Sequence, residues 1–573
     1  MISPVRGPIA YFTMEVALDD DLPTFSGGLG VLAGDYLRST ADLGFPVAGV
    51  TLCYRDGYFR QQLDGEGHQT ENEVSWAAER DRLLERLPNR VVVSVGGHPV
   101  TVGVRRIYLE GVHGDKVPVY FLDTDLEVNY PADRDITDRL YGGDDEHRLR
   151  QETVLGIGGV EMLRSLGYGD VATFHMNEGH SALLTLKLLE EEIASSGESA
   201  PSAPSGEQLD AVRRRCAFTT HTPVPAGHDR FSSDLVRRVL GEERAALLDH
   251  VVPGGVLNMT DLGAGLSRYV NAVSRRHRSV AQAMMPGSEV TSVTNGVRIA
   301  TWASPPMQEL FDGHIRGWRS DGVLLRYASR IPLEAVVAVH GAAKKALLAE
   351  VARRTGTVLP EDGLTIGLAR RVTPYKQTTL LFTDPARLAG IAERHGPLNV
   401  VASGKAHPRD AAGKELIAGL FRAAGALGDG VRLVFIENYD LRLAARLCAG
   451  TDLWLNTPKA PLEASGTSGM KAAVNGVPSL SVLDGWWLEG CIEGVTGWAV
   501  GHGSPDADDA EELYAKLEEV ARVFFADPTR FDDVRRNAIA LNGSFFNTDR
   551  MAREYALSAY STDSADPPPL RRL

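Results

Sequence analysis

Lys471 lies in the segment "EASGTSGMKAAVNG" (463–476), in which a lysine follows glycines and small hydroxyl residues. The apolar run before this segment (451–456) predicts a buried strand, and the residues around the lysine predict a helix that ends at Gly476. A strand that turns through such a loop into a helix presents backbone N–H groups to an anion. We therefore expect Lys471 to hold an anion or to carry a cofactor; a solvated side chain is the alternative.

Two common catalytic patterns do not fit the lysine segment. A P-loop requires a glycine, the lysine and then Ser or Thr, whereas Met470 precedes Lys471 and Ala472 follows it. A serine-nucleophile elbow requires G-x-S-x-G at a strand-to-helix turn together with a paired histidine, and this combination is absent from the sequence. These mismatches argue against a P-loop protein and against a serine hydrolase.

A second segment, "LTIGLARRVTPYKQ" (364–377), is rich in cations. Arg370, Arg371 and Lys376 follow a predicted strand, and the side chains of arginine and lysine suit phosphate oxygens. The whole chain carries a net charge of −15, which argues against nucleic acid as a partner. A basic cluster in so acidic a chain favours a specific anion over a solvated basic turn.

Glycines precede a predicted helix in "PTFSGGLGVLAGD" (23–35), at Gly27, Gly28 and Gly30. Such a loop lets the backbone approach a phosphate closely, although a tight turn would use the same residues. The spacing is not that of the dinucleotide fingerprint G-x-G-x-x-G. Taken alone, this segment therefore favours a turn, and it supports an anion site only together with the basic segments.

Histidines follow predicted strands in two further segments, "TFHMNEGHSALL" (173–184) and "FTTHTPVPAGHDRF" (218–231). A zinc site would be one reading, but the H-E-x-x-H pattern is absent, and the four cysteines are isolated from one another. We therefore expect no metal. We favour contacts to sugar hydroxyls for His221 and leave structural roles open for the other three, which are His175, His180 and His228.

The segments around these residues alternate short apolar runs with helical patterns, and we expect no hairpins joined by tight turns. This alternation predicts an α/β chain with two doubly wound, Rossmann-like domains that face a cleft. The expected parts are an N-terminal domain at 1–300 with a surface loop near 193–208, a C-terminal domain at 301–560 and a tail at 561–573. Neither a signal peptide nor a run of about 18 apolar residues is visible, and the cysteines are scattered, so we expect a cytoplasmic protein that does not contact a membrane.

Together the segments resemble those of the glycogen and α-glucan phosphorylases, and the compact bacterial type is the most similar. The resemblance extends from about residue 8 to about residue 500 and includes the segments described above. It also includes "RLYGGDDEHRLRQE", "VTNGVRIATW", "SGKAHPRD" and "ENYD", in the same order as in that family. So many independent matches are specific, and they imply the GT-B glycosyltransferase architecture.

The resemblance implies a role for each matching residue. It implies that Lys471 carries pyridoxal 5′-phosphate and that Arg371 and Lys376 hold inorganic phosphate beside the cofactor. The implied catalytic residues are Lys471, Arg371, Lys376 and His221. The implied cofactor contacts are Lys471, Thr467, Ser468, Arg370, Tyr375 and Gly28, with Trp302 nearby. The implied substrate contacts are Gly27, Gly28, Asn295, Glu463, Ser465, Gly466, His180 and Glu15.

The implied activity is reversible phosphorolysis, in which inorganic phosphate replaces a terminal α-1,4-linked glucose and gives α-glucose 1-phosphate with retention. The implied partners are therefore inorganic phosphate, glucose 1-phosphate and an α-glucan oligosaccharide. The resemblance leaves open whether the chain forms a homodimer.

Departures from the family concern the acceptor sugar. Lys459 and Ala460 stand where two arginines are usual, Leu488 stands where an acidic residue is common, and 274–282 departs from the small, acidic pattern. The segments near 240–258 and 310–345 are also shorter than in the relatives. Three alternatives remain: a phosphorylase with a non-glucan acceptor, a nucleotide-sugar glycosyltransferase of the same architecture, and a glucan-binding relative without catalysis.

Overall fold

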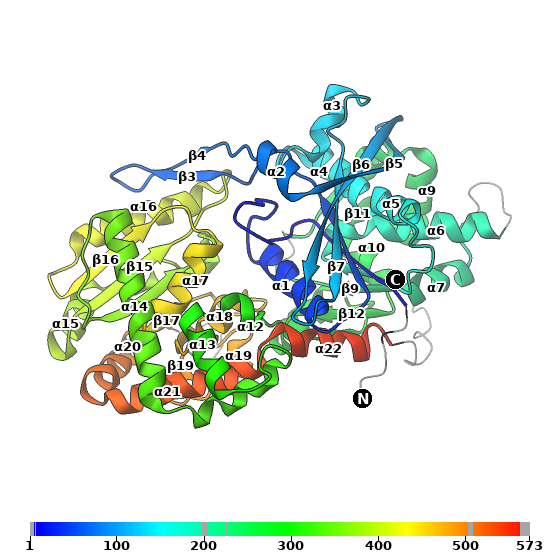
Figure 1. Ribbon diagram of the computed structural model, residues 1–573. Helices are drawn as coiled ribbons and strands as arrows, with labels where there is room; N and C mark the ends of the chain where they lie inside the picture. The colour runs from blue at the N-terminus through cyan, green and yellow to red at the C-terminus, as the bar shows by residue number, and fades with distance from the viewer. Residues whose placement is uncertain (1–4, 6, 197–202, 225–226, 502–507, 562–573) are drawn as a thin grey trace. The chain divides into compact units, whose positions relative to one another are not determined.

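The computed structural model describes residues 5, 7–196, 203–224, 227–501 and 508–561 (Figure 1). The chain forms two compact units. The first comprises the residues up to 58, residues 73–293 and those from 551 on, and the second comprises residues 59–72 and 294–550. Among the described residues, no helix is both long and apolar enough to cross a membrane. The single domain boundary expected near residue 300 stays a prediction.

The first unit is built on a nine-stranded sheet with the order β13-β12-β9-β8-β1-β2-β7-β6-β5. Its strands are β1 (Ile9–Thr13), β2 (Val47–Leu52), β5 (Glu85–Val95), β6 (His98–Glu110), β7 (Lys116–Asp123), β8 (Thr173–Asn177), β9 (Cys216–Thr219), β12 (Tyr269–Ala272) and β13 (Val290–Ser292). The seven strands from β13 to β7 pair in parallel. Because β2 lies on one side of β1 and β8 on the other, the strand order reverses at β1, which is where α/β proteins bind ligands.

The second unit is built on a six-stranded, all-parallel sheet with the order β16-β15-β14-β17-β18-β19. Its strands are β14 (Leu364–Ala369), β15 (Leu398–Ser403), β16 (Val431–Ile436), β17 (Leu453–Asn456), β18 (Ser479–Val482) and β19 (Gly497–Val500). The strand order reverses between β14 and β17, as in a doubly wound sheet. The predicted fold class, an α/β chain with two doubly wound sheets, is confirmed.

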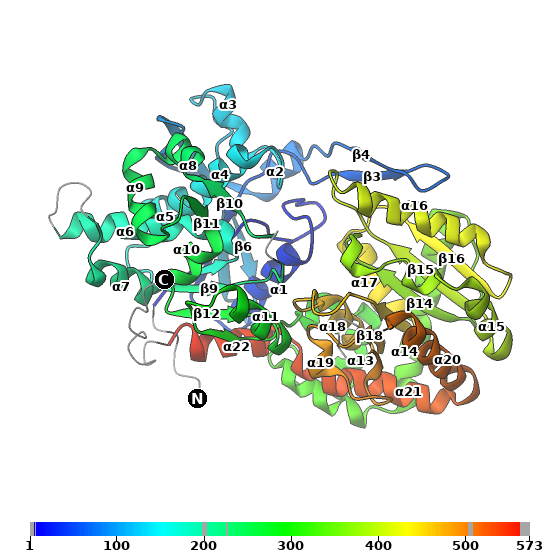
Figure 2. The ribbon, with the colours of Figure 1, turned by 180° about the vertical axis from the view of Figure 1, so that it is seen from behind.

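Helices connect and cover the strands in both units (Figures 1 and 2). Those of the first unit are α1 (Gly28–Asp42), α2 (Ala77–Leu83), α3 (Pro131–Arg134), α4 (Asp145–Thr153), α5 (Gly159–Ser165), α6 (Leu183–Ser195), α7 (Gly206–Arg215), α8 (Ser233–Leu240), α9 (Glu242–Val251), α10 (Met259–Gly265) and α11 (Arg275–Met284). Those of the second unit are α12 (Ile299–Trp302), α13 (Pro305–His314), α14 (Leu333–Thr355), α15 (Pro385–His395), α16 (Ala411–Ala426), α17 (Leu441–Gly450), α18 (Thr467–Val474), α19 (Trp487–Gly490), α20 (Asp509–Ala526) and α21 (Pro528–Asn537). The last helix, α22 (Thr548–Ser558), begins in the second unit and ends in the first.

The expectation of no tight-turn hairpins is wrong. Strands β5 and β6 pair antiparallel at one edge of the large sheet, and a second hairpin joins β3 (Arg60–Leu63) to β4 (Gln69–Asn72). A small antiparallel pair, β10 (Arg230–Ser232) and β11 (Val256–Asn258), adds to these. The turn between β5 and β6 is formed by Gly96 and Gly97, both at positive φ, and a Gly-Gly pair between alternating strands is a recognised hairpin signal.

Other expected segments are described only in part. Of the loop expected near 193–208, residues 197–202 lie outside the described residues, and α6 ends at Ser195 while α7 begins at Gly206. Of the tail expected at 561–573, all but residue 561 lies outside them. Helix α15 begins at Pro385, behind the capping side chain of Asp384.

The amino-terminal end of the second sheet contains a buried charge cluster around Asp452. The Asp452 carboxylate accepts hydrogen bonds from Lys344 at 2.7 Å, Arg535 at 2.6 Å and His340 at 3.0 Å. All four side chains are buried. The cluster therefore ties α14 and α21 to the strand that leads to the lysine segment.

Replacing Asp452 by alanine should strongly destabilise the second unit, because it leaves two buried cations without their shared anion. The expected loss is about 3–5 kcal/mol, measured as a lower midpoint of denaturant unfolding. The control is Glu361→Ala, which breaks an exposed ion pair with Lys345 and should cost less than about 1 kcal/mol. Equal midpoints for the two variants would show that the Asp452 cluster does not support the fold.

Candidate active site

The strand-order reversal of the second unit brings two predicted segments to the same edge of the sheet. Strands β14 and β17 are neighbours, with Ile366 beside Leu453 and Gly367 beside Trp454. The basic segment follows the carboxyl end of β14, and the lysine segment follows the carboxyl end of β17. Parallel strands end at the same edge, so the two segments lie side by side at the place where this fold binds ligands.

Arg370 and Arg371 differ in burial although they are adjacent. Arg370 is buried, and its guanidinium donates hydrogen bonds to the Asn456 side chain at 2.5 Å and to Thr457 Oγ1 at 3.4 Å. Burial lowers the pKa of Arg370 to about 10, so it remains a cation at neutral pH. Arg371 is exposed to solvent. Within the described part of the chain, Nε of Arg370 is buried without a hydrogen-bond partner.

Lys376 and Glu463 form an ion pair. Nζ of Lys376 donates to Oε2 of Glu463, and it lies 4.9 Å from the centre of the Tyr375 ring. Burial alone lowers the pKa of Lys376, but the Glu463 carboxylate and Tyr375 more than offset this effect, so its pKa is raised above the usual value. The Glu463 backbone N–H is held by Asp484 at 2.8 Å. The ion pair thus joins Lys376, which is predicted to bind phosphate, to Glu463, which is predicted to bind sugar.

Lys471 lies in the second turn of α18 and is buried. The helix starts after Gly466, which adopts a left-handed conformation with φ of 85°. Nζ of Lys471 lies 3.9 Å from the centre of the Trp302 ring, a cation–π distance. The predicted strand, loop and helix around Lys471 are therefore present, with β17 before the loop and α18 after it.

The other residues of the lysine segment differ in their hydrogen bonding. Ser468 Oγ accepts a hydrogen bond from the Trp454 indole at 3.1 Å, and Thr467 is half-buried at the start of α18. Ser465 Oγ and Asn295 Oδ1 are buried and have no hydrogen-bond partner among the described residues. Buried polar atoms are normally satisfied, so these two groups indicate that a ligand or water completes the site.

In the first unit, Glu15 follows β1 and binds the glycine loop. Its Oε2 accepts the backbone N–H groups of Ser26 at 2.6 Å and Gly27 at 3.2 Å, and its Oε1 accepts the Tyr141 hydroxyl at 3.0 Å. A Cβ at Gly30 would approach this carboxylate to 2.9 Å, whereas a Cβ at Gly28 would meet nothing within 4 Å. The loop backbone is thus fixed by a buried carboxylate at Gly27 and remains open at Gly28.

His221 is held by Asn177, the last residue of β8, and by Glu178, which follows it. Its Nε2 lies 2.6 Å from Asn177 Oδ1, and its backbone N–H donates to Glu178 Oε2 at 2.6 Å. The Asn177 amide nitrogen donates to Thr13, so Oδ1 is the acceptor and the hydrogen of His221 is assigned to Nε2. Burial and nearby histidines lower the pKa of His221 to about 3. A neutral His221 therefore presents Nδ1 as an acceptor for a hydroxyl group.

The other three histidines have different surroundings. Both ring nitrogens of His175 are bonded within the first unit, to Tyr560 at 2.6 Å and Thr219 at 2.8 Å, so His175 is structural. His228 Nδ1 bonds to Thr260 at 2.5 Å. His180 Nε2 lies 3.3 Å from Asp229, and burial lowers the pKa of His180 to about 4. Near pH 7 the His180 ring is therefore neutral.

Sequence reasoning missed several residues that shape these sites. Glu178 adopts a φ of 77°, which is rare for a residue with a side chain, and its carboxylate binds the backbone of His221 and the hydroxyl of Thr220. Asn456, which binds Arg370, was also missed. The only available signal was that each is a polar residue at the end of an apolar strand.

Glu178 should make the stability of the first unit depend on pH. Burial raises its pKa to about 7 from the ordinary value of 4.5, so between these values the folded chain keeps a proton that the unfolded chain has lost. Stability from this group is therefore present below about pH 4.5 and falls as the pH rises towards 7. In Glu178→Gln this loss should disappear, a difference on the order of 3 kcal/mol between pH 4.5 and 7 in denaturant unfolding. Glu127→Gln, at an exposed position, should keep the wild-type profile, and a Glu178→Gln profile parallel to wild type would contradict the assignment.

Comparison with known proteins assigns the glycine loop and the lysine segment to one family. The family model described as carbohydrate phosphorylase matches residues 15–149 and 243–496, which include the glycine loop and the lysine segment. The chain is 38% identical to the maltodextrin phosphorylase of Thermococcus litoralis over 97% of this chain and 70% of that protein. It is 34% identical to the glycogen phosphorylase of Mycobacterium tuberculosis (96% and 70%) and 33% identical to that of Aquifex aeolicus (97% and 86%). Matches of this extent show that the chain belongs to the carbohydrate phosphorylase family.

Proposed function

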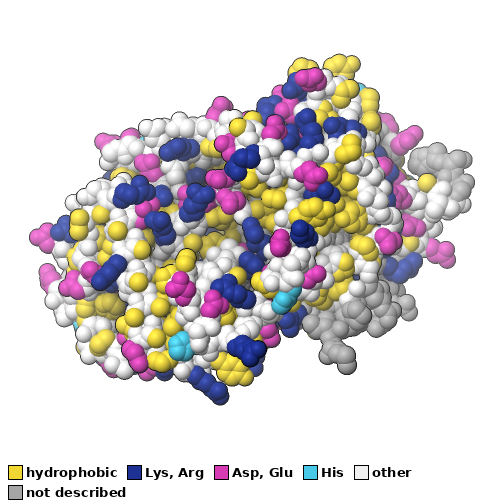
Figure 3. Space-filling view, viewed as in Figure 1, with side chains coloured by type: hydrophobic (Ala, Val, Ile, Leu, Met, Phe, Trp, Pro, Cys, Tyr) yellow, Lys and Arg dark blue, Asp and Glu magenta, His cyan; other side chains and the backbone are white. Residues whose placement is uncertain are grey.

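We propose that this chain is an α-glucan phosphorylase that transfers a terminal α-1,4-linked glucose to inorganic phosphate and releases α-glucose 1-phosphate with retention. The observation that supports this most directly is the group of buried and half-buried cations at the carboxyl edge of the second sheet, in a chain of the carbohydrate phosphorylase family. The matching relatives named maltodextrin phosphorylase and glycogen phosphorylase support an α-glucan substrate. On the face shown in Figure 3, Lys and Arg side chains are interspersed with Asp and Glu side chains.

The residues around Lys471 fit pyridoxal 5′-phosphate, which carbohydrate phosphorylases generally use. Lys471 supplies a buried amine, and the buried guanidinium of Arg370 and the buried hydroxyl of Ser465 retain unsatisfied atoms. Lys471 would hold the cofactor covalently, and the remaining proposed cofactor contacts are Thr467, Ser468, Arg370, Tyr375 and Gly28. When bound, the cofactor supplies a phosphate group that exchanges a proton with the substrate phosphate.

Arg371 and Lys376 are the groups that we assign to the substrate phosphate. Two phosphate dianions placed side by side repel each other, so the site needs fixed positive charge. Arg370 is buried and bonded to the end of β17, which leaves the exposed Arg371 as the guanidinium able to reach a diffusing anion. The raised pKa of Lys376 keeps its ammonium group charged at neutral pH. A bound phosphate would then share Lys376 with Glu463.

We assign uncharged side chains and hydrogen-bond acceptors to the binding of the sugar. Glu463, Ser465, Gly466 and Asn295 of the second unit, and His221, His180, Glu15 and Gly27 of the first, are the proposed substrate contacts. Ser465 and Asn295 offer unsatisfied buried atoms, and Nδ1 of His221 is an acceptor. An inverted hydroxyl would leave such groups unpaired at about 1–3 kcal/mol each, so the site should select glucose over its epimers. We propose linear maltooligosaccharides as the acceptors.

The test of this function is phosphate release from sugar 1-phosphates with maltotetraose as acceptor. Glucose 1-phosphate should react and galactose 1-phosphate should not. Arg371→Ala should lower the rate steeply, since each charged hydrogen bond that is lost costs about 1.5–3 kcal/mol, or roughly ten- to a hundredfold. Arg432→Ala, at an exposed position near the opposite end of a strand of the same sheet, should behave as wild type. Equal rates with both sugar phosphates, or a fully active Arg371→Ala, would refute the assignments.

Lys471 should carry pyridoxal phosphate covalently. The purified protein should absorb in the near-ultraviolet to visible range, and borohydride treatment should add the reduced cofactor to the peptide that contains Lys471. In Lys471→Ala this label should be lost, whereas Lys345→Ala, which removes an exposed lysine of the same unit, should retain it. A colourless, cofactor-free protein with full activity would contradict the proposal.

A further inference from the structure

The β3–β4 hairpin is preceded and followed in the chain by residues of the first unit, but it belongs to the second. Residues up to 58 and residues 73–293 belong to the first unit, whereas residues 59–72 belong to the second by their contacts. Figures 1 and 2 both show β3 and β4 beside α16, which follows β15. At the hairpin turn, Gly67 lies against the Phe421 ring of α16, where a Cβ would come within 2.4 Å. The hairpin therefore contacts the second unit along its length.

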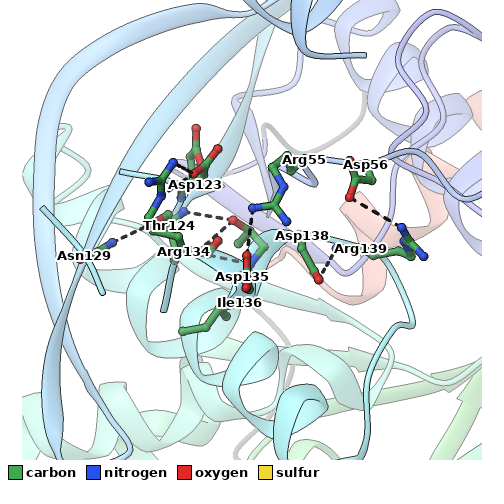
Figure 4. Close-up of polar contacts among 12 residues, drawn as sticks. Arg55, Asp56, Asp123, Thr124, Asn129, Arg134, Asp135, Ile136, Asp138 and Arg139 are labelled. Atoms are coloured by element: carbon green, nitrogen blue, oxygen red, sulfur yellow. Dashed lines mark hydrogen bonds and ion pairs between the residues drawn. The ribbon is translucent and has the colours of Figure 1, made fainter. Parts of the chain in front are cut away.

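The base of the hairpin is fixed within the first unit. The backbone N–H groups of Arg55 and Asp56 donate to the carbonyls of Thr137 and Asp138 at 2.9 and 2.8 Å. Ion pairs reinforce these contacts, with Arg55 bound to Asp135 at 2.9 Å (Figure 4). Arg139 lies 3.7 Å from Asp56 on one side of the hairpin and 3.1 Å from Glu73 on the other. Both chain ends of the hairpin thus leave from a rigid base.

Two buried glutamines, Gln61 and Gln69, attach the hairpin to the second unit. Gln61 Nε2 donates to Gln69 Oε1 and to the carbonyl of Gly404, both at 2.9 Å. Gln69 Nε2 donates to the carbonyl of Ala406 at 2.9 Å and to Glu71 at 2.7 Å. Gln69 Oε1 also accepts the N–H of Ala406 at 3.0 Å. All four amide hydrogens are used, and a fully satisfied buried network specifies one arrangement of its members.

Gln61 also fixes the next loop of the second sheet. Its Oε1 accepts the N–H of Asn438 at 3.0 Å, and its backbone exchanges two further hydrogen bonds with the Asn438 side chain, at 2.7 and 2.8 Å. Asn438 adopts a left-handed conformation with φ of 57°, which such side-chain bonds help to hold. One glutamine therefore joins the loops that follow β15 and β16.

The loop held by the glutamines, 403–406, in turn holds the segment that contains Arg371. The carbonyl of Ser403 accepts the N–H of Arg370 at 3.2 Å, and the carbonyl of Lys405 accepts the N–H of Val372 at 3.0 Å. Gly404 lies so close that a Cβ would approach the carbonyl of Arg370 to 2.0 Å. Arg371 lies between the two bonded residues, so its backbone position follows that of the loop.

We propose that Gln61 and Gln69 are positioning residues for the substrate phosphate, acting through loop 403–406 on Arg371. This inference rests on the proposed phosphorylase function, in which Arg371 binds phosphate. The glutamines do not touch the anion; they fix the backbone from which the guanidinium reaches it. A shift of about 1 Å in such a group can cost up to roughly a hundredfold in rate. The hairpin thereby forms part of the framework of the proposed phosphate site.

The test replaces each glutamine by methionine, which has a similar length but makes no amide hydrogen bonds. Gln61→Met and Gln69→Met should each raise the KM for phosphate about tenfold or more and leave the KM for maltooligosaccharide within about twofold. Backbone hydrogen exchange in residues 403–406 should become faster. The matched control is Gln62→Met, next to Gln61 but on the exposed face of the hairpin, which should leave KM values and exchange unchanged.

The outcomes separate the inference from the proposed function. Unchanged exchange and phosphate KM in folded glutamine variants would overturn the positioning role, as would equal rises in both KM values together with a lower melting temperature. If one variant fails to fold, the other decides by the same two measurements. If the wild-type protein shows no phosphorolysis, the proposed function fails, and the exchange measurement alone then decides whether the glutamines fix loop 403–406.

Discussion

Burial of positive charge at the carboxyl edge of the second sheet is the constraint around which that unit is organised. Arg370 is removed from water, and its guanidinium donates hydrogen bonds to the neutral groups of Asn456, Leu455 and Thr457. A buried cation without an anionic partner is costly, and the lowered pKa of Arg370 reflects that cost. An anion at this edge would therefore stabilise the fold as well as occupy the site.

The first unit uses acidic side chains, where the second unit uses cations. Glu15 and Glu178 each accept backbone N–H groups, from the glycine loop and from His221 respectively. Carboxyl groups used in this way fix loops whose backbone must stay accessible, while burial keeps the surrounding histidines neutral. The two units thus offer different chemistry: neutral donors and acceptors in the first, and cations in the second.

The same topological rule places the key residues of both units. In the parallel part of each sheet the strand order reverses, at β1 in the first and between β14 and β17 in the second, and the polar residues follow those strands. Loops that leave a reversal point diverge, which opens space for a ligand at the carboxyl ends. At the far end of β17, the Asp452 cluster uses charge to tie α14 and α21 to the sheet, and all of its members are buried.

The β3–β4 hairpin shows how a short segment can belong to one unit by connection and to another by contact. Its alternation of buried and exposed residues is local, with Gln61 and Gln69 inward and Gln62 and Thr70 outward. Because the buried residues are polar, a pattern of apolar residues could not predict which face of the hairpin is buried. What determines it is the set of carbonyl and N–H groups that the loops after β15 and β16 leave unpaired.

Local sequence determined the parallel strands, the glycine loop and the strand–loop–helix around Lys471, because apolar runs and glycines act over a few residues. It also carried the family resemblance, which depends on residue order alone. The tertiary structure decided the rest. His175 lies within β8 and His221 lies two residues after β9, and it is the tertiary contacts with Tyr560 and Thr219 that make the first structural. Lys376 pairs with Glu463, which lies 87 positions away in the chain. The backbone N–H group of Ser26, which donates to Glu15, lies beyond a turn. Such pairings depend on which strands become neighbours, and that is a property of the folded sheet and not of any local segment.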